Sequence, residues 1–300
     1  MRKTLLFTVI VYMITSVALA QQEDQLIKWT TLALYKYRVV PNIVYQTAGG
    51  VDIRLDVTQA KEGSTPRPTV IFIHGGGWSA ANKDREWPWA LPYLVKGMSF
   101  VNVDYRHSPV ALAPAAVEDC RCALRWVYNH AKDYNFDLTR LVVIGYSAGG
   151  HLALTTGMLT SSAGFDDECP GEGEMKVAAI VNLYGVTDVV DSLERPNTQG
   201  QSSALRWFGS VPNRIELARR LSPVNLVRNG LPPILTIHGD SDPAVPYGQA
   251  VRLHQALDQV GAKNQLLTFA GGGHGFNLEQ ALKAQETIFD FLAEYGILPH

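Results

Sequence analysis

The sequence alternates short apolar runs with helical patterns, and this alternation limits the folds open to the chain more than any other feature. Runs of four to seven mostly apolar residues occur at 69–73, 100–103, 141–144, 177–183, 233–237 and 266–269. Between or after them, apolar residues recur at helical spacing, at 115–131, 149–159, 249–260 and 278–291. Strands that are apolar throughout are buried on both faces, as in sheets whose parallel strands are connected by helices. We therefore predict an α/β fold with a mostly parallel central sheet and helices on both faces.

Three further segments complete this outline. Residues 43–45 and 51–57 flank Thr47-Ala48-Gly49-Gly50, which predicts a hairpin and hence an antiparallel start to the sheet. The spacing of apolar residues predicts a helix at 22–37. Residues 188–223 interrupt the alternation and are a candidate cap insertion. No linker rich in Gly, Ser or Pro divides residues 21–300, so we expect one domain.

The first twenty residues have the features of a secretory signal peptide. Arg2 and Lys3 precede an uncharged apolar stretch, and Ala18-Leu19-Ala20 fits a cleavage site before the polar residues 21–24. The apolar stretch is shorter than the roughly 20 residues that a membrane-spanning helix needs. We expect residues 1–20 to be removed, leaving a secreted or periplasmic protein without a membrane span. A retained N-terminal anchor is the alternative.

Composition excludes several other classes of protein. Hydrophobic residues make up 46% of the 300 residues, which is far too many for a disordered chain. The net charge is −2 and no dense basic run occurs, so nucleic acid is not an expected partner. No His or Cys spacing is typical of zinc, and we expect neither a metal nor an organic cofactor. The oligomeric state is left open.

The three cysteines leave two pairings open. Cys120 and Cys122 are two residues apart on a predicted helix, so they point to different faces and cannot easily bridge each other. In an oxidising compartment Cys169 can pair with either of them, which leaves one thiol free. Three small buried thiols are the alternative.

The strongest sign of chemistry is Gly145-Tyr146-Ser147-Ala148-Gly149, which directly follows the apolar run at 141–144 and precedes a helical pattern. A serine on a tight strand-to-helix turn has an exposed hydroxyl, and the crowded backbone beside it admits only very small residues. The helix that follows points its N-terminus at the serine and favours developing negative charge. Ser147 is therefore the candidate nucleophile.

A serine nucleophile needs a base and a carboxylate that orients the base. His274 lies in a glycine-rich loop directly after the run at 266–269, and Asp240 and Asp242 follow the run at 233–237. The carboxyl ends of parallel strands share one edge of a sheet, so these residues can meet there. We predict a triad of Ser147, His274 and Asp242, with Asp240 as the alternative acid.

A glycine-rich segment can supply the remaining element of acyl transfer. His74-Gly75-Gly76-Gly77 follows the run at 69–73. A tetrahedral oxyanion requires backbone N–H donors that bulky side chains do not cover. Gly76 and Gly77 can provide two such donors, and Ala148 can provide a third. We predict these three residues as the oxyanion hole.

Together these motifs resemble those of the α/β-hydrolase fold, and within it the esterase and lipase branch that includes hormone-sensitive lipase and the bacterial acetyl esterases. The resemblance covers essentially residues 40–295. It is carried by His74-Gly75-Gly76-Gly77-Trp78, Val103-Asp104-Tyr105-Arg106, residues 145–150, His238-Gly239 with Asp242, and His274-Gly275-Phe276. It implies a serine carboxylesterase that forms an acyl-enzyme, and the family spacing favours Asp242 as the acid.

A narrower resemblance suggests the substrate. The exported form and Tyr134-Asn135-Phe136-Asp137 are similar to bacterial acetyl and feruloyl esterases that act on plant cell-wall polysaccharide. This implies short-acyl or feruloyl esters of small molecules or oligosaccharides. The cap insertion is short and polar, without a long apolar helix to line a channel for a fatty chain.

Aromatic residues near the predicted catalytic edge are candidates for substrate binding. Trp78, Tyr146 and Trp207 could stack on a sugar ring or a feruloyl group, as could Phe208 and Tyr247. Ordinary packing of the cap is the alternative for each of them.

Other polar residues of the motifs are predicted to be structural. His74, His151 and His238 are expected to form hydrogen bonds without taking part in catalysis. Asp104 and Arg106 are expected to pair as a brace near the His74 loop.

Three other functions compete with an esterase. A lipase would act on longer acyl esters. Peptidases and amidases similar to prolyl oligopeptidase share the His-Gly motifs, but they usually carry a large N-terminal propeller. Non-catalytic binding proteins on this fold typically lose the Ser or the His, and both are present here.

Overall fold

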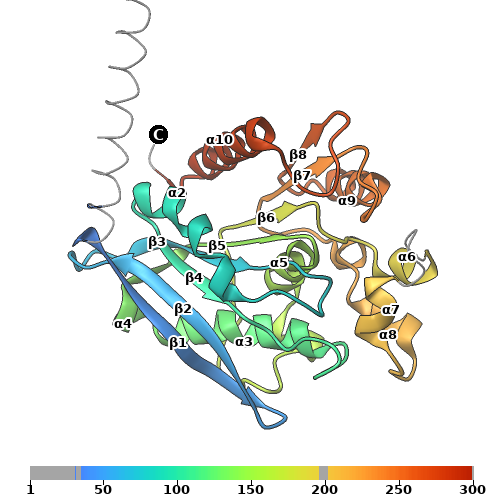
Figure 1. The fold of residues 1–300 in the computed structure, drawn as a ribbon, viewed down its shortest axis with the longest axis horizontal. Coiled ribbons are helices and arrows are strands. Elements are labelled where there is room, and N and C mark those ends of the chain that lie inside the picture. Colours follow the sequence, from blue (N-terminus) through green and yellow to red (C-terminus); the bar gives the residue numbers. More distant parts are fainter. Residues whose placement is uncertain (1–30, 32–34, 196–201, 299–300) are drawn as a thin grey trace, which may run out of the picture.

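The computed structural model describes residue 31 and residues 35–195 and 202–298 (Figure 1). The predicted signal peptide at 1–20 and most of the helix predicted at 22–37 lie outside the described residues. Residue 37 already begins a strand, so the end of that predicted helix is wrong. Within the described ranges, no helix is long and apolar enough to cross a bilayer.

Within the described residues, eight strands form one sheet in the order β1-β2-β4-β3-β5-β6-β7-β8. Their bounds are β1 (Tyr37–Ala48), β2 (Val51–Ala60), β3 (Arg67–Ile73), β4 (Ser99–Val103), β5 (Phe136–Tyr146), β6 (Ala179–Leu183), β7 (Ile234–Gly239) and β8 (Asn264–Phe269). β2 pairs antiparallel with both β1 and β4, and every other pair is parallel. The mostly parallel sheet with an antiparallel start is confirmed.

The β1–β2 hairpin turns at two glycines. Gly49 and Gly50 have φ angles of +59° and +78°. A two-residue turn that matches the twist of the strands needs positive φ at both positions, which glycine adopts at little cost. The predicted hairpin is therefore present, with strands longer than the apolar pattern alone indicated.

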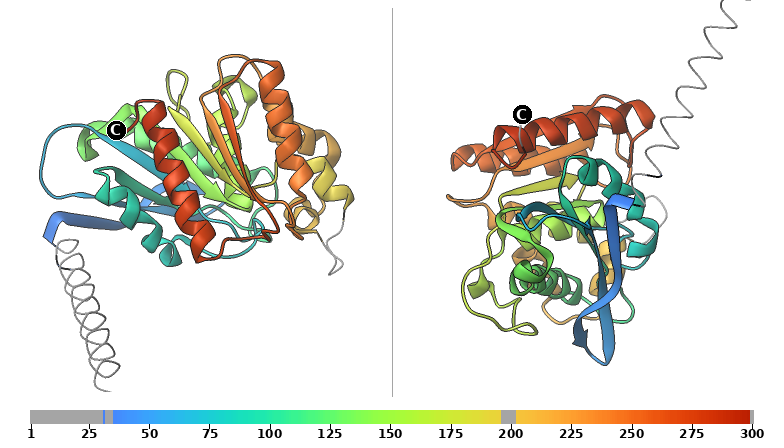
Figure 2. Two further views of the ribbon diagram at one scale, coloured as in Figure 1. Left: turned by 90° about the horizontal axis from the view of Figure 1, so that it is seen from above. Right: turned by 90° about the vertical axis from the view of Figure 1, so that its left-hand side faces the viewer.

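Helices cover both faces of the sheet (Figure 2). The α-helices are α2 (Ala90–Val95), α3 (Ala115–Asn129), α4 (Ala131–Tyr134), α5 (Ala148–Met158), α6 (Val189–Glu194), α7 (Ser203–Phe208), α8 (Arg214–Arg220), α9 (Tyr247–Gln259) and α10 (Leu278–Glu294). Short 3-10 helices are η1 (Lys83–Arg85), η2 (Trp87–Trp89), η3 (Ser161–Ala163) and η4 (Pro223–Leu226). α3, α5 and α9 share one core cluster, and α2 and α10 share the other.

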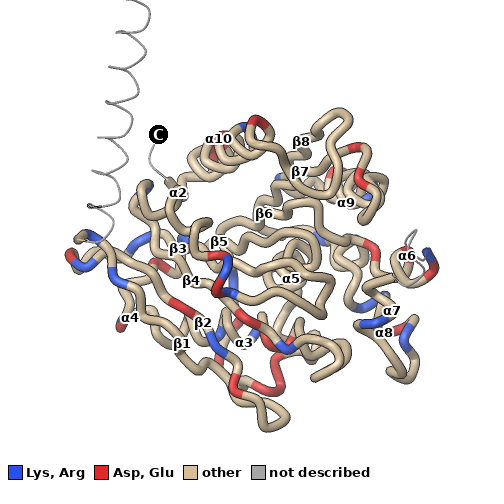
Figure 3. Tube along the Cα trace, in the orientation of Figure 1, with Lys and Arg blue, Asp and Glu red and all other residues tan. Residues whose placement is uncertain are grey.

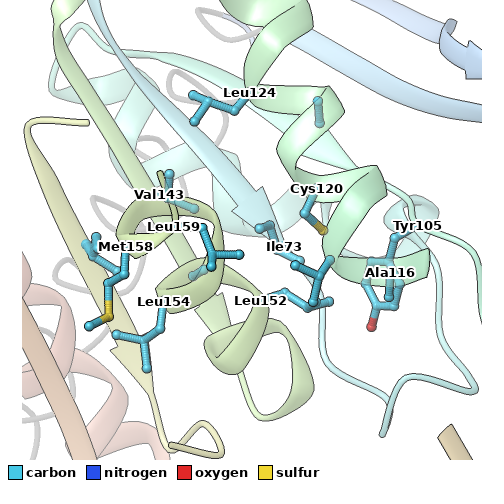
Figure 4. Close-up of a cluster of buried hydrophobic side chains, with 14 of the residues drawn as sticks. Ile73, Tyr105, Ala116, Cys120, Leu124, Val143, Leu152, Leu154, Met158 and Leu159 are labelled. Atoms are coloured by element: carbon cyan, nitrogen blue, oxygen red, sulfur yellow. The ribbon is translucent and has the colours of Figure 1, made fainter. Parts of the chain in front are cut away.

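Alternate side chains of the central strands enter these two clusters. Ile71, Ile73 and Val143 belong to the cluster with α3 and α5, and Figure 4 shows Ile73 and Val143 beside those helices. Val70 and Val142 belong to the opposite cluster, with α2 and α10. Because both faces of these strands are buried, their central stretches are nearly continuous apolar runs.

Residues 188–223, predicted as a cap insertion, hold the short helices α6, α7 and α8 between β6 and β7. Trp207 and Phe208 of α7 are fully buried. α6 also contacts α7 and α8, so the described part of the insertion packs onto the domain as a small helical cluster.

A disulfide joins Cys122 of α3 to Cys169, and Cys120 is a buried free thiol. Figure 4 shows Cys120 among the apolar side chains of the α3–α5 cluster. Two arginines of α3 hold the same loop: Arg121 pairs with Asp166, and Arg125 donates to backbone carbonyls of the loop.

The predicted brace between Asp104 and Arg106 is wrong. Arg106 instead forms a buried ion pair with Asp119 at 2.7 Å and reaches Glu168 at 2.8 Å. Asp104 accepts a hydrogen bond from the backbone amide of Lys83 at 2.7 Å. A buried guanidinium requires a carboxylate within reach, and α3 presents Asp119 directly to it. Figure 3 shows acidic and basic residues interspersed near β2 and α3.

Candidate active site

Ser147 lies on a strained turn between β5 and α5. Its φ and ψ angles are +54° and −122°, which residues other than glycine rarely adopt. The flanking glycines permit the turn: a Cβ on Gly145 would lie 2.2 Å from the carbonyl oxygen of Gly149, and one on Gly149 would lie 2.1 Å from that of Ile73. The close approach inferred from the motif is thus present.

The structure brings Ser147, His274 and Asp242 into one chain of hydrogen bonds. Ser147 Oγ is 2.8 Å from His274 Nε2, and His274 Nδ1 is 2.7 Å from Asp242 Oδ2. Asp242 follows β7 and His274 follows β8, at the same edge of the sheet where β5 ends in the Ser147 turn. Asp240 is turned away and accepts a hydrogen bond from the Gly271 amide at 2.7 Å.

The carboxyl of Asp242 is buried and surrounded by donors. Its Oδ1 accepts the amides of Ala244 and Val245 at 2.8 and 2.9 Å, and its Oδ2 lies 3.1 Å from His238 Nε2. Burial alone would raise the pKa of Asp242, but the hydrogen bonds from His238, His274 and the Val245 amide outweigh burial and hold the pKa well below its usual range. Asp242 is therefore a carboxylate at neutral pH.

The predicted oxyanion residues border the same cavity. Gly76, Gly77 and Ala148 line it together with Ser147. Gly76 has a φ of +107° and a Cβ there would lie 2.0 Å from the Ala80 carbonyl oxygen, so this position tolerates only glycine. The three residues and Ser147 thus border one space, where acyl transfer requires backbone donors beside the nucleophile.

The cavity has a volume of about 710 Å³. Tyr146 lines one wall, and its hydroxyl donates to the buried Glu86 at 2.9 Å while its ring stacks on Trp89. Tyr184 lines the wall beside His274, with ring centroids 5.0 Å apart. Burial raises the pKa of Tyr184 to about 12, so it remains a neutral phenol.

The prediction that Trp78 and Trp207 offer stacking surfaces to a substrate is wrong. Trp207 is 0% exposed and does not line the cavity, and Trp78, which borders it, is 2% exposed. The two indoles stack on each other at 4.5 Å, and Trp78 Nε1 donates to the buried His151. Phe208 is also fully buried. These rings are used in packing, whereas Tyr146, which also lines the cavity, is only half-buried.

The cavity is also lined by a set of polar residues, the polar wall, which the motifs did not reveal. Its members come from the insertion and from α9, and they are Asp191, Ser192, Arg195, Ser202, Ser203 and Gln249. Gln249 is fully buried and donates to both Asp191 and Ser192, so it fixes α6 at the cavity. In the sequence Gln249 was only a residue of a helical pattern, and nothing near it signalled this role.

Among the described residues, no group of three or more His, Cys, Asp or Glu side chains is arranged to hold a metal ion.

Comparison with known proteins places this site in context. Residues 55–257 match the family model described as BD-FAE. The esterase LipC of Mycobacterium tuberculosis is 30% identical over 239 residues, which cover 75% of this chain. The match covers 57% of LipC, so the chain spans about half the length of such curated relatives.

Solved structures match over more of their own length. A truncated carbohydrate esterase from gut microbiota has a TM-score of 0.73 and 28% identity, and the match covers 87% of this chain and 97% of that one. A propionate-bound esterase of Thermogutta terrifontis has a TM-score of 0.72 and 27% identity, and covers 86% of this chain and 95% of that one.

Proposed function

Because the chain belongs to the BD-FAE family and has the α/β-hydrolase fold of esterases, we propose that it is a serine carboxylesterase acting on short-acyl or feruloyl esters of plant polysaccharide. The observation that carries the proposal is the hydrogen-bonded chain from Ser147 through His274 to Asp242, set in a cavity beside the amides of Gly76 and Gly77.

In the proposed reaction, Ser147 Oγ attacks the ester carbonyl while His274 Nε2 takes its proton. Asp242 keeps the His274 ring in place and stabilises the imidazolium. The amides of Gly76, Gly77 and Ala148 stabilise the oxyanion of the tetrahedral intermediate. The C–O bond then breaks, and the alcohol leaves with the proton from His274. Water, activated by His274, hydrolyses the acyl-enzyme and restores Ser147.

The cavity supports a hydroxylated rather than a fatty substrate. One wall carries carboxylate, guanidinium, hydroxyl and amide groups, which suit the hydroxyls of a sugar. The described part of the insertion is made of helices of six and seven residues, too short to line a long acyl channel. The similarity to a carbohydrate esterase and to an esterase that binds propionate agrees with this assignment.

We also propose that the protein is exported and acts in the periplasm or outside the cell. The signal-peptide pattern at 1–20 motivates this assignment. The Cys122–Cys169 disulfide supports it, because disulfides persist mainly in oxidising compartments.

Acyl preference tests the substrate class. We expect kcat/KM for p-nitrophenyl esters to be highest at acetyl or butyryl and to fall toward decanoyl, and we expect acetate or ferulate release from xylan fragments. A buried methylene contributes about 0.8 kcal/mol, so a lipase would gain steeply with chain length. A steady rise beyond butyrate would indicate a lipase. Faster cleavage of an aminoacyl anilide than of any ester would indicate a peptidase or amidase.

A further inference from the structure

We propose that His238 is a positioning residue of the active site, which holds the Asp242 carboxylate in the orientation that receives His274. The inference rests on the proposed function, because it gives His238 a task in aligning the triad. It goes beyond the sequence-based expectation of a purely structural histidine.

His238 shares one carboxylate oxygen with the catalytic histidine. It is fully buried near the end of β7, and its Nε2 lies 3.1 Å from Asp242 Oδ2 and 3.1 Å from the carbonyl oxygen of Val245. His274 Nδ1 lies 2.7 Å from the same Oδ2. Because both neighbours of His238 Nε2 are acceptors, this nitrogen carries a proton and donates it to them.

The other ring nitrogen of His238 does not compete for the proton. Nδ1 is buried and has no hydrogen-bond partner among the residues that the structure describes. An unpartnered buried N–H is less readily tolerated than an unpartnered lone pair, so the contacts place the donated proton of His238 on Nε2.

The contacts of Asp242 then leave it no other orientation. Oδ2 accepts from His238 and His274, and Oδ1 accepts from the amides of Ala244 and Val245. His238 thereby ties the strand end to the turn that carries the acid. A further titratable group beside His238 is Tyr247, whose ring meets the edge of the His238 imidazole at a centroid distance of 5.8 Å.

Three substitutions separate positioning from packing. His238→Met fills a similar volume without a donor, and His238→Gln places an amide N–H where Nε2 lies. His238→Asn carries the same amide one methylene short, and it replaces His238→Met if that variant does not fold. His254→Met is the matched control, because His254 is also buried but pairs with Asn264.

We expect His238→Met to lower kcat roughly 10- to 100-fold with KM changed by less than about threefold, since a hydrogen bond to a charged group is lost. The acid limb of its kcat/KM–pH profile should also move, because the Asp242 carboxylate that pairs with His274 has lost one of its hydrogen-bond donors. His238→Gln should return both measurements to near wild type. His238→Asn should behave as His238→Met, and His254→Met should leave both unchanged.

Two kinetic results would overturn the proposal. One is a His238→Met variant with kcat within twofold of wild type and an unmoved acid limb. The other is a His238→Gln variant as impaired as His238→Met, which would show that only the imidazole shape matters. The downfield proton NMR signal of the His274 Nδ1–H bond provides a readout without turnover. This signal should shift in His238→Met and not in His238→Gln. The expectation holds even if the wild type hydrolyses no ester. An unchanged signal in both variants refutes the positioning role.

Discussion

Removing the Cys122–Cys169 disulfide should destabilise the folded protein without abolishing its activity. The two cysteines are 47 residues apart in the sequence. The loss of loop-closure entropy for a cross-link of this span corresponds to about 4 kcal/mol of folding free energy. Because domains are typically stable by only about 5–15 kcal/mol, the double variant Cys122→Ala/Cys169→Ala should unfold at clearly lower urea concentration.

Activity should survive this change under native conditions. The loop around Cys169 is also held by the Arg121–Asp166 ion pair and by bonds from Arg125 to backbone carbonyls, and none of these groups lines the catalytic cavity. Urea unfolding followed by tryptophan fluorescence measures the loss, with Cys120→Ala as the matched control that keeps the bridge. A loss below about 1 kcal/mol in the double variant, or three titratable thiols in denatured oxidised wild type, would refute the reasoning.

Three further predictions, each tested by substitution, concern other parts of the structure. Gly149→Ala should abolish activity and destabilise the fold, because its methyl group would lie 2.1 Å from a carbonyl oxygen of β3. In the control Gly248→Ala the methyl group meets only a side-chain atom at 3.8 Å, so this variant should match wild type in activity and in stability. Asp242→Asn should lower kcat/KM about 10³- to 10⁴-fold and Asp240→Asn less than about tenfold, and equal losses would reverse the assignment. Burial, with the charge of a neighbouring carboxylate, raises the pKa of Glu118 to about 7, so the folded state loses stability as pH rises toward 7. The free energy of unfolding of Glu118→Gln should therefore exceed that of wild type by about 1–2 kcal/mol at pH 8 and by much less at pH 5. An equal gain in this free energy at both pH values would contradict the prediction.

The sheet was predictable because each buried strand is marked by an apolar run in its own short stretch of sequence. Strands buried on both faces are mostly apolar, and the runs at 69–73 and 141–144 lie within β3 and β5. Strand ends were less predictable, because pairing decides them: β5 begins at Phe136, which pairs with Arg67 in a stretch where the register shifts. The turn around Ser147 was predictable because its glycines are required by backbone contacts within the motifs.

Partners chosen by tertiary packing were not predictable. Arg106 pairs with Asp119, which lies 13 residues further along the chain, and not with its neighbour Asp104. The stacking of Trp78 on Trp207 joins two segments far apart in sequence and removes both rings from the cavity. Motif spacing contains no signal for such contacts, because a side chain near a catalytic edge can point into the cavity or into the core.

Covalent labelling of Ser147 is the most direct test of the central claim, that this residue is the nucleophile of a serine esterase. A fluorophosphonate probe should label the wild-type protein on the peptide that contains Ser147, and should label neither Ser147→Ala nor wild type preincubated with a covalent serine inhibitor. Ser147→Ala should keep the unfolding curve of the wild type and lose p-nitrophenyl acetate hydrolysis by at least about 10³-fold. Labelling of another residue, or activity of Ser147→Ala within tenfold of wild type, would contradict the account.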